Sequence, residues 1–187
     1  MKSGAGVQIS APNSISMDIE NVCNIIHKIT EGFDANAMKC LEYHSGNIVV
    51  AIQEQIYSGQ NGKGEHLSPT YDTDPYFEQD GPWYHRAHDY KAWKQSITPP
   101  VTSSLLGLPP RPDNVPNLFI NGKFFSEITA TRRGDMLYVN PGSGNGPKIV
   151  AKYGDSLLDI GDSAVAYFNR EYMWPAIEKY FNDCGYR

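Results

Sequence analysis

The sequence predicts an α+β protein, with N-terminal helices, a long irregular arm and a C-terminal unit in which a β-hairpin packs with helices. Three observations predict this class. Apolar residues recur at three- and four-residue steps in the first sixty residues, most of the 13 prolines lie between residues 58 and 116, and runs of β-forming residues flank a turn near residue 134. We expect one domain over residues 1–187, divided into a helical block (1–60), the arm (58–116) and an α+β unit (117–187).

The helical block begins with a helix whose apolar residues lie on one face. Its periodic positions are Ile19, Val22, Ile25, Ile26 and Ile29. Ser16 or Asp18 can cap the free N–H groups of its first turn, and Gly32 is expected to end it.

A second helix is expected over residues 34–56. Its weak point is the Ser45-Gly46-Asn47 sequence, because glycine inside a helix costs about 1 kcal/mol. Residues 48–52 (Ile-Val-Val-Ala-Ile) could instead form a buried strand after a break there. We favour the helix, because the following Gln-Glu-Gln continues the pattern without a turn signal.

The arm differs in kind, because proline lacks an N–H and fixes φ, which prevents long helices and central strands. One short helix is expected at about residues 85–96. Disordered segments are poor in aromatic residues, whereas this one is rich in them, so we expect the arm to pack on a surface, its own or that of a neighbouring subunit. Its candidate subunit-interface residues are Tyr76, Trp83, Tyr84, Tyr90 and Trp93.

In the α+β unit, residues 125–132 and 136–139 are expected to pair as strands around an Arg133-Gly134-Asp135 turn. A glycine-rich loop follows at 141–147, then a short helix at 148–153 that Gly154 ends. The last helix is expected from Ser163 through Phe181, with a kink at Pro175.

Composition excludes several functional classes. The formal charge is −5, and Arg132 and Arg133 are the only adjacent arginines, whereas nucleic-acid binding needs clustered Lys and Arg. The longest aliphatic run falls far short of the ~18 residues of a membrane span. The three cysteines are scattered and do not suggest a disulfide framework.

Four motifs suggest chemistry, and each has a simpler explanation. Residues 142–148 contain glycines before a lysine, but the spacing and Pro147 do not fit a phosphate-binding loop, and residues 59–64 suit a flexible turn. His85 and His88 could face one cation from a helix, with His66, Asp80 or Asp89 as further ligands, but a solvated or core-edge helix is the commoner explanation. Cys40 and His44 lie one helical turn apart, as a thiolate–imidazole pair would, but a buried cysteine is the commoner explanation. We therefore predict no enzyme, no catalytic residue, no metal site and no cofactor.

The α+β unit resembles phage head–tail connector and tail-completion proteins. Residues 116–128 (Pro-Asn-Leu-Phe-Ile-Asn-Gly-Lys-Phe-Phe-Ser-Glu-Ile) are similar to the entry motif of these families, although Asn121 stands where the pattern usually has Thr. Lys152-Tyr153-Gly154, the leucines at 157 and 158 and Trp174-Pro175-Ala176 follow in the family's order. The arm, with residues 90–94 (Tyr-Lys-Ala-Trp-Lys), resembles neck or ring proteins of crAss-like phages of Bacteroidota.

The resemblance implies a structural virion protein of the neck or tail, made in the host cytoplasm and assembled as a ring around the DNA exit channel. Its implied partners are its own copies and the portal or other neck and tail proteins, with passing contact to DNA and none to membranes. Two alternatives remain open: an adaptor or inhibitor unrelated to virions, and a metal-dependent hydrolase that uses His85 and His88.

Overall fold

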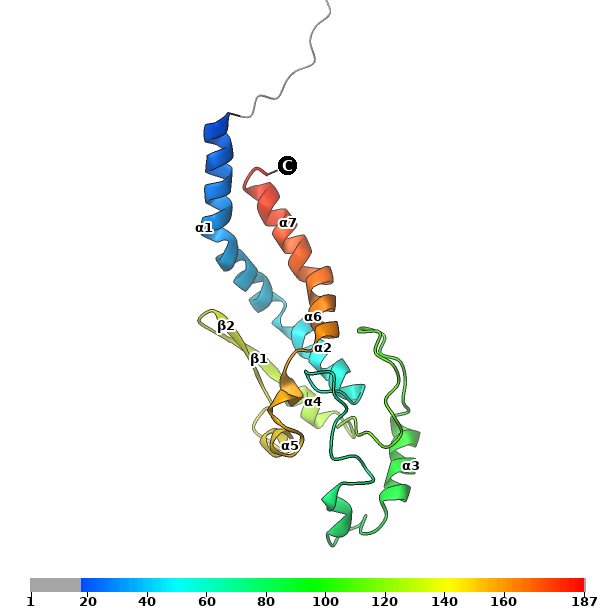
Figure 1. Ribbon diagram of the computed structural model, residues 1–187. Helices are drawn as coiled ribbons and strands as arrows, with labels where there is room; N and C mark the ends of the chain where they lie inside the picture. Colours follow the sequence, from blue (N-terminus) through cyan, green and yellow to red (C-terminus); the bar gives the residue numbers. More distant parts are fainter. Residues whose placement is uncertain (1–17, 187) are drawn as a thin grey trace, which may run out of the picture.

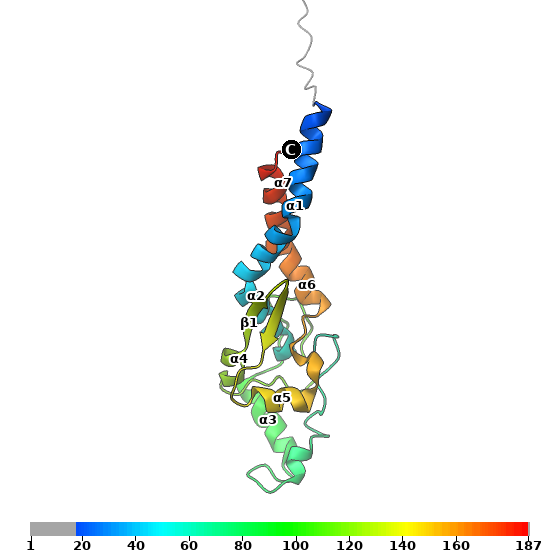
Figure 2. The same cartoon turned by 90° about the vertical axis from the view of Figure 1, so that its left-hand side faces the viewer.

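Two helices project side by side from one end of an elongated molecule, and the arm occupies the other end (Figures 1 and 2). The computed structural model describes residues 18–186. The projecting helices are α1 (Ile19–Tyr43) and α7 (Trp174–Asp183), called the helical pair below. The rest of the described chain, called the body, combines helices with a two-stranded antiparallel sheet, so the α+β class is confirmed.

Helix α1 continues through the glycine that was expected to end it. Asp18 caps its start by accepting a hydrogen bond from the Glu20 N–H, while Ser16 lies outside the described residues. Gly32 lies in mid-helix. A Cβ at this position would lie 2.3 Å from the Tyr180 hydroxyl of α7, so only glycine leaves room for Tyr180. The glycine therefore permits close approach of two helices instead of ending one.

Helix α2 (Ser45–Tyr57) forms the centre of the body. The second helix does not span residues 34–56 as expected, because residues 34–43 belong to α1 and the chain breaks at His44. Residues 48–52 are helical, so the strand alternative is wrong and the helix favoured there is confirmed. Its buried side chains are Ile48, Val49, Ala51, Ile52, Gln55 and Ile56. The Gln55 side-chain amide also bonds to the Asp159 carbonyl and the Gly161 N–H, which ties α2 to the C-terminal part of the chain.

The arm is irregular, as expected, except for the 3₁₀ turn η1 (Pro75–Glu78) and α3 (Ala87–Ile97). It contributes buried side chains of its own, namely Leu67, Tyr71, Phe77, Leu108 and Val115. The arm was expected to pack either on its own chain or on a neighbouring subunit. These side chains are buried against the described chain itself.

The hairpin is shorter than expected at its start. Strands β1 (Thr129–Arg133) and β2 (Met136–Asn140) pair with Arg133 opposite Met136, around a turn in which Gly134 has φ 65°. Residues 125–127 belong instead to α4 (Lys123–Glu127), so the strand predicted there is wrong. The reason is burial: Phe124 and Phe125 are consecutive and both enter the core, which a strand's alternation does not allow.

The chain ends in three helical pieces that run without a break. After α5 (Gly146–Tyr153) and the 3₁₀ turn η2 (Asp155–Leu158), α6 (Asp162–Phe168) leads through a π-helical turn, η3 (Asn169–Met173), into α7. The expected irregularity is this π-helical turn, which lies just before Pro175, because a proline inside a continuous helix cannot donate to the preceding turn. None of the helices in residues 18–186 has the length and hydropathy to cross a membrane.

Candidate interaction surface

Side chains of α7 hold the helical pair together along one side of α1. The Tyr180 hydroxyl donates to the Lys28 carbonyl oxygen at 2.7 Å, over the surface that Gly32 leaves free. The rings of Phe33 and Phe181 lie 6.3 Å apart, in a tilted arrangement typical of aromatic pairs. These contacts fix the two helices against each other.

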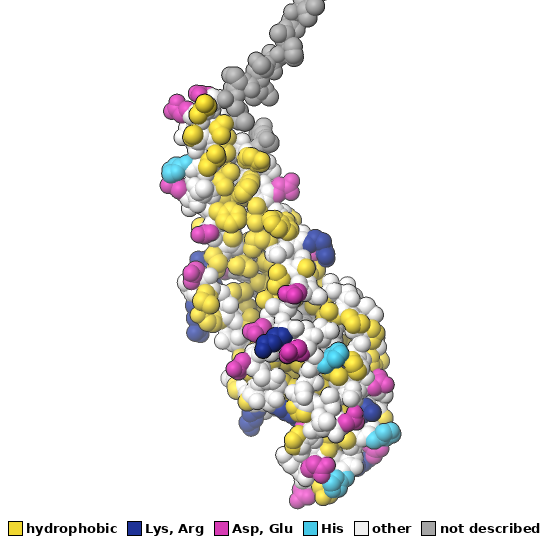
Figure 3. Space-filling view, viewed as in Figure 1, with side chains coloured by type: hydrophobic (Ala, Val, Ile, Leu, Met, Phe, Trp, Pro, Cys, Tyr) yellow, Lys and Arg dark blue, Asp and Glu magenta, His cyan; other side chains and the backbone are white. Residues whose placement is uncertain are grey.

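A strip of apolar side chains runs along the pair beside this contact. Ile19, Ile26 and Phe33 are seven residues apart on α1, and Trp174 and Phe181 are seven apart on α7, so each set follows one side of its helix. The Phe33–Phe181 contact joins the two rows. We call these five residues the apolar strip, and Figure 3 shows apolar side chains gathered along both helices.

Most of the strip is open to solvent. Ile19 is 79% exposed, Ile26 55% and Trp174 61%. Among the described residues, Cys40 is the only buried side chain in the 25 residues of α1, and α7 has none. Two helices alone leave one side of each apolar face uncovered, because a helical core needs a third or fourth helix to close it.

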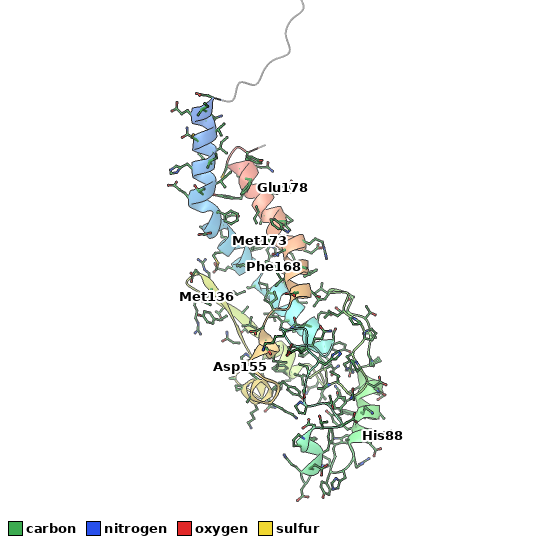
Figure 4. All side chains as sticks on the ribbon, in the orientation of Figure 1. His88, Met136, Asp155, Phe168, Met173 and Glu178 are labelled. Carbon is green, nitrogen blue, oxygen red and sulfur yellow. The ribbon has the colours of Figure 1, made fainter. Side chains whose placement is uncertain are left out.

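The π-helical turn sets where the α7 part of the strip points. Phe168, before the turn, is buried in the body, and Met173, at its end, packs against the same core. A π turn adds one residue to the helical repeat. Trp174 follows directly and is exposed, and Glu178 lies further out along α7 (Figure 4).

The interface candidates of the arm lie mainly in one aromatic cluster. The Tyr90 ring centroid is 5.1 Å from that of Trp83 and 5.4 Å from that of Trp93, and the two tryptophans stack at 5.7 Å. These three side chains are half-buried, whereas Tyr76 and Tyr84 are exposed. Their assignment to a subunit interface stays a prediction.

Two buried cations lie beside this cluster. Lys94 is 2% exposed and donates to the Phe119 carbonyl oxygen, and Arg111 is 4% exposed and donates to the Thr98 carbonyl oxygen at 2.6 Å. Desolvation, with the nearby Arg111 charge, lowers the pKa of Lys94 to about 8. Neither burial could be predicted from the sequence, since a single Lys or Arg carries no local signal of burial.

An apolar hollow of about 570 Å³ lies between the hairpin, η2 and the α6–η3 segment. Its walls include Leu137 and Val139 of β2, Leu158 of η2, and Val165 and Phe168 of α6. Val165 is 37% exposed at its edge. The hollow is a second apolar surface, distinct from the residues of the strip.

No protein-family model, curated protein or solved structure matches the chain. The resemblance to head–tail connector proteins therefore stays a prediction. In the structure its residues fall on the loop before α4 and on α4 itself, on the end of α5 and on the start of α7.

The histidines proposed as metal ligands do not share a helix face. Helix α3 begins at Ala87, and His85 precedes it with φ 53° and faces Glu78, its Nδ1 lying 3.4 Å from the carboxylate. The side chain of His88 is 89% exposed (Figure 4). Within residues 18–186, no three His, Cys, Asp or Glu side chains are grouped as metal ligands would be.

Cys40 and His44 are separated by their surroundings. The Cys40 thiol is buried 3.6 Å from the Tyr172 carbonyl oxygen, and burial raises its pKa, which disfavours the thiolate. The His44 ring instead stacks on Tyr172, with ring centroids 4.3 Å apart.

The glycine-rich loop is filled by a carboxylate of the chain itself. The Gly144 N–H donates to Glu127 Oε2 at 3.3 Å, and a Cβ at Gly142 would lie 2.6 Å from the Glu127 Cβ. These glycines therefore allow the loop to close over Glu127.

Proposed function

We propose that this chain is a structural subunit of a phage head–tail connector or tail, assembled from identical copies into a ring around the DNA exit channel. The observation that carries the proposal is the apolar strip, which residues 18–186 leave exposed. The resemblance of residues 116–128 to connector proteins supports the same function.

The helical pair supplies a large part of a subunit interface. Helix α1 with its 25 residues is about 37 Å long, α7 with its 10 residues is about 15 Å long, and each is about 10 Å wide, which gives up to about 500 Å² per copy. Stable interfaces bury about 800 Å² per partner. A second copy of this chain is the occupant we propose.

A ring needs two different surfaces on each copy, because a head-to-tail contact joins one surface to the other. The apolar strip and the hollow beside the hairpin are two such surfaces. Burying apolar area contributes about 25 cal/mol per Å² before the costs of association. The net charge of −5 fits a channel wall past which DNA slides, since a basic wall would bind the phosphates.

Ile26→Glu in the full chain tests the proposal by mass photometry and negative-stain electron microscopy. We expect the unaltered chain to form closed rings. Because the substitution buries an unpaired charge in the interface, we expect it to weaken association by about a hundredfold or more.

Val101→Glu is the matched control, because Val101 is 51% exposed, close to the 55% of Ile26, and lies in the arm away from the strip and the hollow. Rings should survive this change. A chain that stays monomeric at all concentrations, or that loses its rings equally in both variants, would refute the proposal. Gold-labelled antibodies against the chain should bind the neck or tail of virions.

A further inference from the structure

The outer strand of the hairpin has a free edge that borders the apolar hollow. Strand β1 packs on α2, whereas β2 is the strand that contributes residues to the hollow, namely Leu137, Tyr138 and Val139. Within residues 18–186 the sheet has two strands, so the edge of β2 that faces away from β1 pairs with no strand.

This edge carries unpaired backbone groups. The two-residue turn closes on a hydrogen-bonded pair of Arg133 and Met136, and hydrogen-bonded and non-hydrogen-bonded pairs then alternate along the ladder. The N–H and C=O groups of Leu137 and Val139 therefore point away from β1, and none has a hydrogen-bond partner in the described chain. Such an edge binds an extended segment, because a helix has no free N–H and C=O groups along its side.

The side chains of the hollow favour an apolar segment without negative charge. Its walls include Leu158, Val165 and Phe168. Asp155 and Asp159 also line it, no Lys or Arg does, and neither carboxylate forms an ion pair with a described residue. An acidic occupant would be repelled there.

One segment of the chain outside the described residues, 1–17, has these properties. Residues 7–11 (Val-Gln-Ile-Ser-Ala) alternate apolar and polar side chains, the pattern of a strand with one apolar face. They equal β2 in length, and Pro12, which follows, lacks the N–H that a further ladder bond needs. Lys2 is the one charged side chain among residues 1–17, and its sign is opposite to that of the hollow.

The segment of the same copy is too short to reach its own hollow. Leu41 is the residue of α1 that lines the hollow, and it lies about 33 Å along the helix from Ile19. The start of α1 lies at the end of the helix away from the hairpin (Figures 1 and 2). The chain from Pro12 to Asp18 spans at most about 28 Å when fully extended. A second copy must therefore supply the segment.

We propose that residues 7–11 of a second copy add to β2 as a third strand and fill the hollow with their three apolar side chains. Lys2 of that copy can then pair with Asp155 or Asp159. The inference rests on the proposed assembly of identical copies and names the segment that joins them. Because the segment precedes Ile19, the apolar strip of the same copy begins close to the hollow that its segment fills.

Ile9→Asp in the full chain tests the proposal by mass photometry over a dilution series. Ile9 is the central apolar residue of the segment, so a charge there should weaken association by about tenfold or more. Gln8→Asp is the matched control, because it adds the same charge at a neighbouring position whose side chain faces the opposite side of a strand. Association should change by less than about threefold. Equal weakening by both substitutions would overturn the proposal.

Disulfide cross-linking identifies the occupant of the hollow. One chain carries Ile9→Cys and a second, size-tagged chain carries Val165→Cys, with Cys23 and Cys184 replaced by serine in both. Oxidised glutathione should join the two chains. Absence of this product, or a disulfide that forms within one chain carrying both substitutions, would contradict the proposal.

Two further pairs of chains are the controls. Ile9→Cys should not cross-link to Val101→Cys, which is exposed and lies outside the hollow. Cross-linking of Ile26→Cys to Val165→Cys, in place of Ile9→Cys, would show that the apolar strip fills the hollow and would overturn the proposal.

A synthetic peptide of residues 1–17 separates a failure of this inference from a failure of the ring. If the full chain stays monomeric but binds the peptide, and binds the Ile9→Asp peptide at least about tenfold more weakly, the ring is refuted and the segment site stands. If rings form and Ile9→Asp leaves them unchanged, the segment site is refuted and the ring stands. A chain that neither assembles nor binds the peptide refutes both.

Discussion

The helical pair and the arm reverse the usual relation between sequence pattern and burial. Helix α1 repeats apolar residues at three- and four-residue steps, yet Cys40 is the only buried one among its 25 residues. The arm has almost no periodicity, yet it buries Leu67, Tyr71, Phe77 and Val115 as well as a lysine. Periodicity reports which face of a helix is apolar, whereas burial depends on whether another element covers that face.

This comparison separates folding from assembly. The body has a core around α2 and needs no partner to bury it. The helical pair has an apolar side that nothing in the described chain covers. We therefore expect core substitutions to act on stability and strip substitutions to act mainly on association.

Ile52→Ala should have the largest effect on the stability of the single chain. Ile52 is fully buried in α2, and truncation of a buried isoleucine costs about 2–5 kcal/mol because it leaves a cavity. Ile26→Ala is the matched comparison, and it should lower the free energy of unfolding of the monomer by only about 0.5 kcal/mol. Urea unfolding followed by circular dichroism at low protein concentration measures both. Equal losses would show that the pair and the body do not differ in this way.

Lys94→Met tests the cost of the buried cation in the arm. The folded pKa of Lys94, about 8, lies below the unfolded value of 10.5, so the folded chain binds fewer protons between these pH values and stability rises with pH across that window. Below pH 8 the full cost remains, and the variant should be more stable than the unaltered chain by about 1–3 kcal/mol at pH 7. The difference should shrink as pH rises toward 10.5. Urea unfolding at several pH values measures it, and a difference independent of pH would contradict the mechanism.

Gly32→Ala and Gly46→Ala compare the effect of one added methyl group in the helical pair and in the body. A Cβ at Gly46 meets nothing within 4 Å, so alanine there should stabilise α2 by about 0.5 kcal/mol through helix propensity. At Gly32 the new methyl meets the Tyr180 hydroxyl and displaces its bond to Lys28, so the gain should vanish or become a loss of about 1 kcal/mol. Melting temperatures of the two variants measure the difference. A gain at Gly32 as large as at Gly46 would mean that the helices separate freely.

The sequence was sufficient for elements whose signal is local. The hairpin turn at Gly134, the end of α5 at Gly154, the arm's irregular course and the irregularity before Pro175 all follow from single residues with restricted or permissive backbones. The start of the hairpin was misplaced, because Phe124 and Phe125 are both drawn into the core and favour a helical turn.

The predictions that the structure contradicts concern residues whose surroundings are set by a distant part of the chain. Gly32 lies inside α1 and does not end it, and nothing nearby in the sequence indicates that Tyr180 packs against it. His85 was placed on a helix that begins only at Ala87. The aromatic pocket between residues 71–94 and residues 149–153 could not be predicted either, because only the fold brings these two segments together.

The number of residues in the π-helical turn between α6 and α7 sets the direction in which α7 points. Deleting one residue within 169–173 would restore an ordinary α-helix and rotate everything beyond it by about 100°, carrying Trp174 and Phe181 away from Phe33. Insertions and deletions within this turn therefore change the direction in which α7 leaves the body.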